Sequence, residues 1–367
     1  MTDSEYMHEA LRLAEKGMGF VNPNPMVGAV IVKDGRIIGK GWHRQYGGLH
    51  AERNAFADCT EDCAGASLYV TLEPCCHHGK TPPCTEAVIE HRIGRVIIGS
   101  ADPNPLVAGK GVKILREHGI EVTEGVLKEE CDSLNEIFMH YITANTPFVT
   151  MKYAMTMDGK IACYTGESKW ITGEAARRQV QLDRLRHSAI MVGVGTVIAD
   201  DPMLTCRTEN GRNPVRIICD THLRIPEDCN IVKTAKEIPT IIAVCEAEPK
   251  KAERLAGAGC EILKVGEADG HTDLQQLMKI AVERKIDSIL IEGGGELNWS
   301  ALQAGIVSKV QTYIAPKLFG GAGAKSPLSG QGVPSPDKAF MLTDSRVRRL
   351  GEDFLIESRV KNVHGNN

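Results

Sequence analysis

The most informative segment of the chain is L-E-P-C-C-H-H-G-K-T-P-P-C, residues 72–84, which follows H-A-E at residues 50–52. Cys75, Cys84 and His50 can supply two thiolates and one imidazole, a ligand set that suits zinc. Three protein ligands leave the fourth position open for water, which is the arrangement of a catalytic rather than a structural zinc. The segment therefore predicts a catalytic zinc site.

A glutamate close to these ligands completes the pattern. In zinc deaminases a His and two Cys hold the metal and a Glu that is not a ligand carries protons, with the signature H-x-E…P-C-x-x-C. Here Glu52 follows the histidine, but eight residues instead of two separate Cys75 from Cys84. Two other interpretations stay open: a structural zinc that uses His77 or His78 in place of the upstream histidine, and ordinary buried thiols.

The length and the composition of the chain favour a globular protein with two domains. The chain has 367 residues, 42% of them hydrophobic and 25% charged, which favours two domains of ordinary composition. We find no apolar run near eighteen residues, so we expect no membrane span. The start lacks the basic and apolar regions of a signal peptide. Twelve cysteines scattered over such a chain indicate reduced thiols, and we expect a cytoplasmic protein.

The net charge differs between the two halves. Residues 1–145 carry 14 Lys and Arg against 20 Asp and Glu, a net charge of −6, and the rest of the chain carries 29 against 27, which is +2; together these give −4. Nucleic-acid-binding proteins usually show a clear basic footprint. An acidic first half therefore disfavours a nucleic-acid substrate and favours a small molecule.

The hydrophobic pattern of the first half alternates between helices and strands, which is typical of a three-layer α/β domain. The predicted helices cover residues 5–17, 51–59 and 85–91, and the predicted strands cover 27–32, 36–41, 68–71 and 96–98, with a hairpin turn at 34–35. In a regular helix His50 and Glu52 would not face the same way. A joint role therefore requires His50 at the start of its helix.

The second half begins after a predicted linker at residues 142–147, because Pro147 disfavours a helix through the preceding residue. A strand is expected over 148–154. Further on, a strand at 287–291, the turn E-G-G-G and a helix at 297–303 could bring backbone N–H groups to a phosphate. A tight turn without a ligand is the alternative. No G-x-G-x-x-G follows a strand, so the ordinary dinucleotide fingerprint is absent.

Four motifs of the first half are informative together, and these are N-P-N-P-M-V-G (22–28), H-A-E, L-E-P-C-x-H-x-G-x-T-P-P-C and A-D-P-N-P (101–105). Through these motifs the first half resembles the deaminase half of the bifunctional riboflavin-biosynthesis deaminase–reductases. The wide cysteine spacing is a feature of that family. The resemblance implies a cytidine-deaminase-like domain over residues 1–145, zinc on His50, Cys75 and Cys84, and Glu52 as acid and base. It also implies a set of substrate contacts, which are Asn24, His43, His77, Lys80, Asp102 and Asn104. For Lys80 a solvated surface lysine is the alternative.

The second half resembles the reductase half of the same family, through M-K-Y-A-M-T-M-D-G-K (151–160), G-T-V-I-A-D-D-P-M-L-T-C-R (195–207), D-T-H-L-R-I-P (220–226) and E-G-G-G. This implies a dihydrofolate-reductase-like α/β domain over residues 146–367 that uses NADPH. The implied cofactor contacts are Ala154, Trp170, Thr196, Asp200, Thr221, Gly294, Gly295, Glu296, Leu297, Asn298, Trp299 and Ser300. The implied substrate contacts are Ser168, Arg184, Leu204, Arg207 and Glu292, with Lys152 and Asp200 at the reaction centre. As alternatives, Trp170 could be a core residue, Leu204 could serve packing, and residues 200–202 could form only a turn.

The resemblance implies two consecutive reactions in riboflavin biosynthesis. They are zinc-dependent hydrolytic deamination of 2,5-diamino-6-(5-phosphoribosylamino)pyrimidin-4-one and NADPH-dependent reduction of its ribosyl side chain to ribityl. We expect a phosphorylated pyrimidine as substrate, a homo-oligomer, and neither nucleic acid nor membrane as a partner. Two other classes stay open. A nucleoside or nucleic-acid deaminase fused to an unrelated domain predicts a basic surface and no NADPH binding. A non-enzymatic, zinc-stabilised binding module predicts four protein ligands and no solvent-accessible metal.

Overall fold

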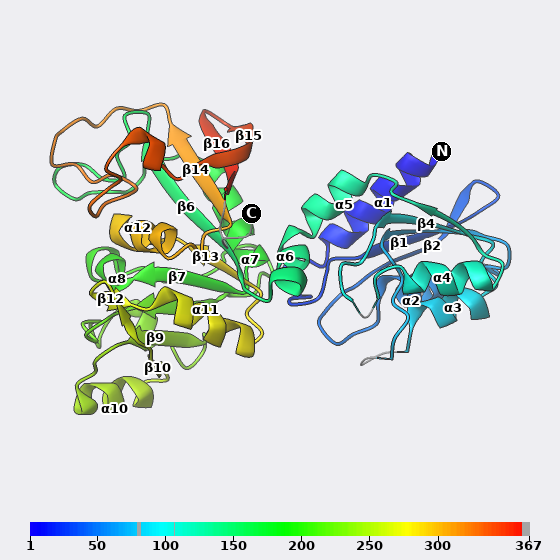
Figure 1. Cartoon of the computed structure of the whole chain (residues 1–367), viewed down its shortest axis with the longest axis horizontal. Helices are drawn as coiled ribbons and strands as arrows, with labels where there is room; N and C mark the ends of the chain where they lie inside the picture. Colours follow the sequence, from blue (N-terminus) through cyan, green and yellow to red (C-terminus); the bar gives the residue numbers. More distant parts are fainter. Residues whose placement is uncertain (79–81, 106, 362–367) are drawn as a thin grey trace. The chain divides into compact units, whose positions relative to one another are not determined.

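The computed structural model describes residues 1–78, 82–105 and 107–361. Lys80, one of the predicted substrate contacts, lies outside the described residues. The chain divides into two units, Met1–Asn145 and Thr146–Asn367, and each unit has its own large sheet (Figure 1). No helix in the described part of the chain combines the length and the apolar character needed to cross a bilayer.

The first unit contains a five-stranded sheet in the order β2-β1-β3-β4-β5. Its elements along the chain are α1 (Asp3–Glu15), β1 (Gly28–Lys33), β2 (Arg36–Trp42), α2 (Ala51–Ala57), β3 (Ser67–Leu72), α3 (Cys84–Glu90), β4 (Arg95–Ser100), α4 (Lys110–Glu117), β5 (Glu121–Glu124), α5 (Lys128–Leu134) and α6 (Glu136–Ala144). Asp34 and Gly35, with φ of 50° and 74°, form the predicted turn between β1 and β2.

Helices cover both faces of this sheet because successive strand residues point to opposite sides. In β1, Ala29 and Ile31 pack with apolar residues of α2, α3 and α4, whereas Val30 and Val32 pack with residues of α1 and α5. Figure 1 shows the same division, with α1 and α5 on one side of the strands and α2, α3 and α4 on the other. The three-layer α/β fold predicted for this part of the chain is confirmed.

The second unit contains a nine-stranded sheet in the order β10-β9-β8-β7-β13-β6-β14-β16-β15. Its elements are β6 (Phe148–Thr156), α7 (Glu174–Arg186), β7 (Ala189–Gly193), α8 (Val194–Asp200), β8 (Val215–Cys219), α9 (Asn230–Lys233), β9 (Thr240–Val244), α10 (Pro249–Gly257), β10 (Glu261–Lys264), β11 (Glu267–Ala268), β12 (His271–Thr272), α11 (Leu274–Glu283), β13 (Ser288–Ile291), α12 (Gly295–Gln303), β14 (Lys309–Ala315), the 3-10 helix η1 (Pro336–Lys338), β15 (Leu342–Leu350) and β16 (Asp353–Val360).

This second sheet is parallel from β10 to β14 and antiparallel only at β16 and β15. Its central part is also covered on two faces, since Met191 packs with α11 and α12 while Ile190 packs with α8, α9 and α10. The carboxyl ends of β6, β7, β8 and β13 therefore meet at one edge of the sheet. In open parallel sheets this edge is where ligands bind.

The predicted linker begins too early. Helix α6 continues through Ala144, and Asn145 ends it in a left-handed conformation with φ of 52°. Pro147 restricts only the residue directly before it, so it does not prevent residues 142–144 from being helical. The connection between the last helix of the first unit and β6 is therefore only three residues long, 145–147.

Candidate active sites

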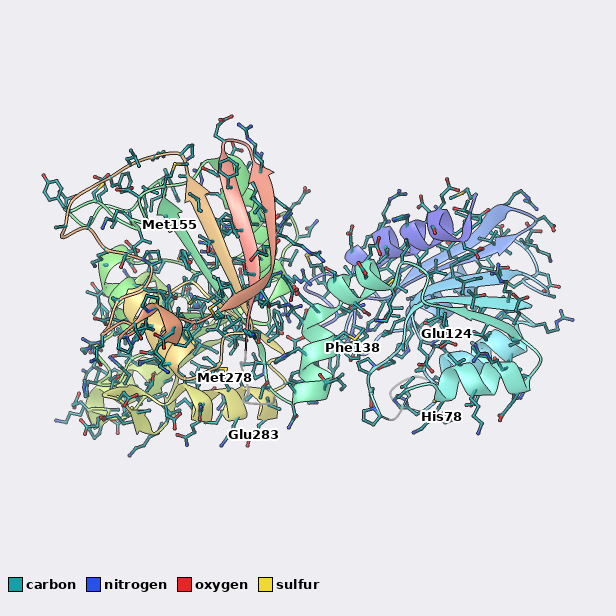
Figure 2. The ribbon with its side chains drawn as sticks, turned by 45° about the horizontal axis from the view of Figure 1, so that its top comes forward. His78, Glu124, Phe138, Met155, Met278 and Glu283 are labelled. Carbon is teal, nitrogen blue, oxygen red and sulfur yellow. The ribbon has the colours of Figure 1, made fainter. Side chains whose placement is uncertain are left out.

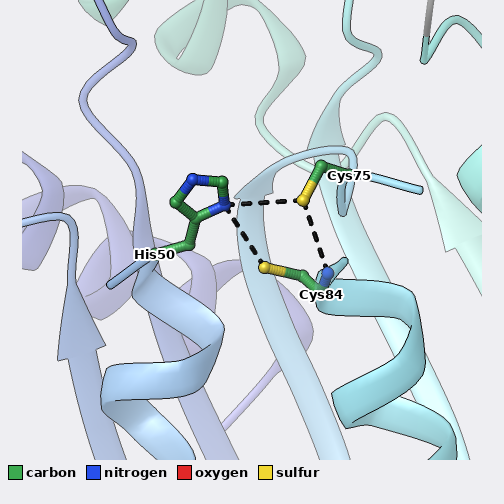
Figure 3. A group of neighbouring side chains, drawn as sticks. All are labelled: His50, Cys75 and Cys84. Atoms are coloured by element: carbon green, nitrogen blue, oxygen red, sulfur yellow. Dashed lines mark hydrogen bonds between the residues drawn. The ribbon is translucent and has the colours of Figure 1, made fainter. Parts of the chain in front are cut away.

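Three side chains of metal-ligand type meet in the first unit, as Figure 3 shows: His50, Cys75 and Cys84, whose ligand atoms all lie within 4.8 Å of one another. His50 Nδ1 is 3.5 Å from Cys75 Sγ and 3.4 Å from Cys84 Sγ. Each residue stands at the end of an element. His50 is the N-cap of α2, Cys75 lies in the turn after β3, and Cys84 is the first residue of α3.

These separations fit a zinc ion. With Zn–S near 2.3 Å and Zn–N near 2.0–2.1 Å, tetrahedral angles place the nitrogen and a sulfur about 3.5 Å apart. Among the residues that the structure describes, this is the one group of three that could hold a metal. His78, considered for a structural zinc, is 74% exposed and pairs with Glu86 at 3.3 Å. The arrangement thus favours three protein ligands over a closed structural site.

The electrostatics of the cluster favour the ligand form of a thiol. The hydrogen bond from Cys84 and the nearby His50 lower the pKa of Cys75 to about 4, although burial acts in the opposite direction. The same contact with Cys75 raises the pKa of His50. The lowered pKa of Cys75 favours its thiolate, which is the form of cysteine that binds zinc.

Glu52 stands next to the cluster and outside its ligand group. Its side chain is only 3% exposed, and burial raises the pKa of its carboxyl group. His50 has the extended conformation of an N-cap, with φ −72° and ψ 165°, so it does not follow the helical rotation of α2. For this reason His50 and Glu52 both line the same cavity, despite their spacing of two residues.

The cavity beside the cluster has a volume of about 290 Å³. Five of the predicted substrate contacts line it, and these are Asn24, His43, His77, Asp102 and Asn104. The predicted residues therefore come together from four separate segments of the chain. Asp102 is 9% exposed, and burial raises its pKa to about 6. Its Oδ1 accepts a hydrogen bond from the backbone N–H of Asn104 at 2.8 Å.

His43 is held in one orientation at the cavity wall. Its Nδ1 faces the carbonyl oxygen of Leu49 at 3.0 Å, and the Asn24 side-chain amide lies 3.2 Å from Nε2. A carbonyl can only accept, so Nδ1 carries the hydrogen and Nε2 accepts from Asn24. Burial lowers the pKa of His43, which favours this neutral form.

Sequence reasoning missed several residues of this cavity. Tyr46, Glu73, Val107 and Phe138 also line it. Phe138 lies on α6 (Figure 2), more than fifty positions after the second predicted cysteine ligand. The aromatic residues stand outside the motifs, so no local pattern indicates them. Glu73 was visible inside L-E-P-C, but nothing in the sequence shows what its carboxylate contacts.

In the second unit, three charged side chains form a nearly buried group at the edge where parallel strands end. Glu292 follows β13, Lys152 lies on β6 and Arg184 on α7. Arg184 Nε donates to Glu292 Oε1 at 2.6 Å and Nη2 donates to Oε2 at 3.0 Å. Lys152 Nζ lies 3.4 Å from Oε2. The side chains are only 8–14% exposed, so the structure brings three predicted site residues into one contact group.

Leu204 precedes Thr205, which contacts this group through its backbone carbonyl. Arg184 Nη1 donates to the Thr205 carbonyl at 2.8 Å. Leu204 itself is 4% exposed, has φ of 52° and packs in the core beside α8 and α9. The packing alternative considered from sequence therefore describes its side chain. Arg207 is exposed and Ser168 is half-buried.

The predicted cofactor residues differ in their placement. Gly294 is the N-cap of α12, and a Cβ at this position would stand 3.7 Å from Thr196 Oγ1, so the E-G-G-G turn and α8 lie side by side. Leu297 packs in the core, and Asn298 is fully buried and donates to the Pro327 carbonyl at 2.9 Å, so both side chains point inward.

Trp170 is 60% exposed beneath the Arg177 guanidinium, so the core alternative for this residue is wrong. Asp200 and Glu296 are exposed, whereas Thr221 is 8% exposed. The other predicted cofactor residues are half-buried, and these are Ala154, Thr196, Gly295, Trp299 and Ser300.

Comparison with known families assigns a class to each unit. Residues 1–100 match the cytidine and deoxycytidylate deaminase zinc-binding region, and residues 147–356 match the RibD C-terminal domain. The chain is therefore an enzyme with a zinc-binding deaminase domain followed by a reductase domain of dihydrofolate-reductase-like fold, which implies a zinc ion and a nicotinamide cofactor.

Full-length relatives narrow the class to one family. The chain is 55% identical to the riboflavin biosynthesis protein RibD of Actinobacillus pleuropneumoniae over 97% of this chain and 95% of that protein. It is 38% identical to RibD of Escherichia coli, over 97% and 99%. The chain belongs to the RibD family of bifunctional riboflavin-biosynthesis enzymes, which confirms the resemblance noted in the sequence.

Solved structures agree over the whole length. A diaminohydroxyphosphoribosylaminopyrimidine deaminase/5-amino-6-(5-phosphoribosylamino)uracil reductase from Thermotoga maritima is 41% identical and has a TM-score of 0.83, covering 98% of this chain and 99% of that one. RibD of Acinetobacter baumannii is 35% identical with a TM-score of 0.86 and the same coverage. Since both domains are matched in one relative, fusion to an unrelated second domain is excluded.

Proposed function

We propose that residues 1–145 deaminate 2,5-diamino-6-(5-phosphoribosylamino)pyrimidin-4-one and that residues 146–367 reduce the ribosyl side chain of the product to ribityl with NADPH. The observation that carries this proposal is the His50–Cys75–Cys84 cluster with Glu52 beside it at the wall of one cavity. Membership of the RibD family gives the substrate class, since the Thermotoga maritima relative is named for this deaminase and this reductase.

In the deaminase half, His50, Cys75 and Cys84 would hold the zinc. Zinc at this position would lower the pKa of a water molecule toward neutrality and so would make hydroxide available at neutral pH. Glu52 would accept one proton of that water and deliver it to the ring nitrogen, and would then transfer the second proton, from the newly added hydroxyl group, to the leaving amine. A buried carboxyl group with a raised pKa suits this shuttle, because it releases and takes up a proton closer to neutral pH.

The cavity wall would orient the pyrimidine. Neutral His43, fixed by Asn24 and Leu49, presents a constant ring edge to the cavity. Asp102 and Asn104 offer polar groups, and Tyr46 and Phe138 offer aromatic surface for a flat ring. Lys80 remains our proposed cation for the substrate phosphate.

In the reductase half, Lys152, Arg184 and Glu292 would orient the substrate, and the turn before α12 together with Thr196 would hold the cofactor. NADPH supplies the hydride that reduces C1′ of the ribose. The Arg184–Glu292 pair fixes both side chains, while Lys152 keeps a cation close to the group. We further propose that the enzyme is a cytoplasmic homo-oligomer that acts on a free small molecule.

Two measurements on purified protein test the proposal. Zinc content and ammonia release from the diaminopyrimidinone test the first half. NADPH oxidation with the separately prepared deaminated aminouracil tests the second half, and the same assay with NADH tests the preference between the two cofactors. We expect about one zinc per chain, ammonia release, and oxidation that prefers NADPH. Absence of ammonia release from zinc-loaded protein, or equal use of NADH, would contradict the corresponding half.

A further inference from the structure

Glu73, inside the L-E-P-C segment, carries a buried carboxylate that the proposed chemistry does not use. The residue is 4% exposed and lies directly after β3, two positions before Cys75. Its Oε2 accepts a hydrogen bond from the Gly109 backbone N–H at 3.0 Å, and its Oε1 accepts one from the Val112 N–H at 3.2 Å. Both donors belong to the start of α4, so a carboxylate from the metal-ligand turn caps a helix almost forty residues away.

The start of α4 lacks the groups that usually satisfy it. Its N-cap, Gly109, makes no side-chain hydrogen bond, and no acidic residue lies in the first turn. The first N–H groups of a helix have no partner within the helix, and the positive end of the helix dipole favours an anion. Glu73 supplies both the acceptors and the negative charge. The hydrogen bonds from Gly109 and Val112 to Glu73 therefore serve as the N-terminal cap of α4.

Gly111 of α4 shows independently how closely this helix packs against the Glu73–Cys75 segment. A Cβ on Gly111 would lie 2.3 Å from the carbonyl oxygen of Pro74 and 3.1 Å from Glu73 Oε1. Real Cβ atoms do not approach backbone atoms so closely, so any larger residue here would push α4 away from the Pro74–Cys75 turn. The absence of a side chain at Gly111 is what allows Glu73 to reach the helix.

The segment that leads into α4 carries part of the cavity wall. Asp102, Asn104 and Val107 line the cavity, and α4 begins three residues after the last of them. Cys75, at the opposite end of the contact, belongs to the metal-ligand cluster. The Glu73 carboxylate therefore links the turn that positions a ligand to the loop that shapes the substrate pocket.

We propose that Glu73 is a positioning residue that couples the zinc-ligand turn at Cys75 to the cavity-lining residues Asp102, Asn104 and Val107 through the N-terminus of α4. The inference rests on the proposed function, because it assumes that zinc and the pyrimidine occupy this site. Loss of the carboxylate should loosen both segments together. Removal of an outer-shell group that holds a metal ligand in place usually lowers metal affinity or activity by roughly 10- to 100-fold.

The test compares Glu73→Gln and Gly111→Ala with two matched controls in the full-length enzyme. Glu86→Gln removes an exposed carboxylate two residues from Cys84, and Gly257→Ala places a methyl group in a helix where nothing lies within 4 Å. The readouts are the rate at which zinc passes to the chelator 4-(2-pyridylazo)resorcinol, the KM for deamination, and the reductase rate of the same chain.

We expect both test variants to release zinc roughly 10- to 100-fold faster and to raise the KM for deamination, with the reductase rate unchanged and both controls like wild type. If Glu73→Gln does not fold, Gly111→Ala decides the question alone. Wild-type values for either zinc release or KM would overturn the coupling, as would a lower melting temperature without any change in these two quantities. A wild-type protein that binds no zinc would instead overturn the proposed function.

Discussion

Arg184 meets Glu292 side-on, with Nε 2.6 Å from Oε1 and Nη2 3.0 Å from Oε2, although the two residues are 108 positions apart. Burial alone would raise the pKa of Glu292, but the charges of Arg184 and Lys152 outweigh it and hold this pKa at about 2. The carboxylate therefore stays ionised at every physiological pH. Arg184 and Lys152 bring two positive charges to one negative charge, which leaves this group cationic.

The depressed pKa of Glu292 predicts acid sensitivity of the reductase domain. The group stabilises the fold fully above its ordinary pKa of 4.5, and this contribution is lost as the pH falls from there toward about 2. Glu292→Gln should lower the free energy of unfolding at neutral pH by about 3 kcal/mol, since two buried cations lose their partner. The free energy of unfolding of the mutant should also depend less on pH in this range than that of the wild type. Denaturant unfolding across this pH range measures both effects.

The control for this experiment is Glu253→Gln, which removes an exposed carboxylate on α10. It should match wild type at every pH. If wild type and Glu292→Gln lost stability in parallel on acidification, the ion pair would not be the source of the acid sensitivity.

The ligand assignment predicts that Cys75→Ser and Cys84→Ser each abolish zinc binding and deamination together. Three protein ligands are the usual number for an open catalytic zinc site, so the loss of one thiolate should release the ion. Zinc content after purification is the measurement. Cys260→Ser, which changes a buried cysteine of the other unit, is the control and should keep zinc. Full zinc occupancy in either ligand variant would show that the assignment is wrong.

Glu52→Gln tests whether the acid–base group is separate from the ligands. Glutamine keeps the shape of the side chain but cannot carry the proton, so deamination should fall by roughly two to four orders of magnitude. Zinc should remain, because Glu52 lies outside the ligand cluster. Reduction of the deaminated aminouracil should be unaffected, since Lys152 and Glu292 belong to the other unit. Loss of both activities in a folded mutant would contradict two independent sites.

Gly294 tests the cofactor turn. A Cβ at this residue would stand 3.7 Å from Thr196 Oγ1, which is ordinary contact, but the branches of valine would fill the space in front of the α12 N-terminus. Gly294→Val should weaken NADPH binding about tenfold or more, which corresponds to ~1.4 kcal/mol. Gly294→Ala should have a smaller effect, and deamination should persist in both. If wild type, Gly294→Val and Gly294→Ala bound NADPH with equal affinity in a titration, the turn before α12 would not be part of the cofactor site.

Much of the fold could be predicted locally. The apolar run at residues 27–32 predicts a strand, and β1 is found at Gly28–Lys33; the turn at Asp34 and Gly35 has the positive φ that such dipeptides tolerate. The linker prediction failed over residues 142–144, because proline constrains only the residue before it and α6 continues up to Ala144.

By itself the sequence determined the chemistry that is available: two cysteines and a histidine for a metal, a glutamate for protons, and motifs that identify the family. These properties follow from residue identity and spacing. Tertiary structure alone decided which of these groups lie together. It brings His50, and not His78, to the cysteines, places Phe138 in the cavity, aims Glu73 at α4 and pairs Arg184 with Glu292. Contacts across such distances in the chain depend on how layers pack, and packing leaves no local pattern in the sequence.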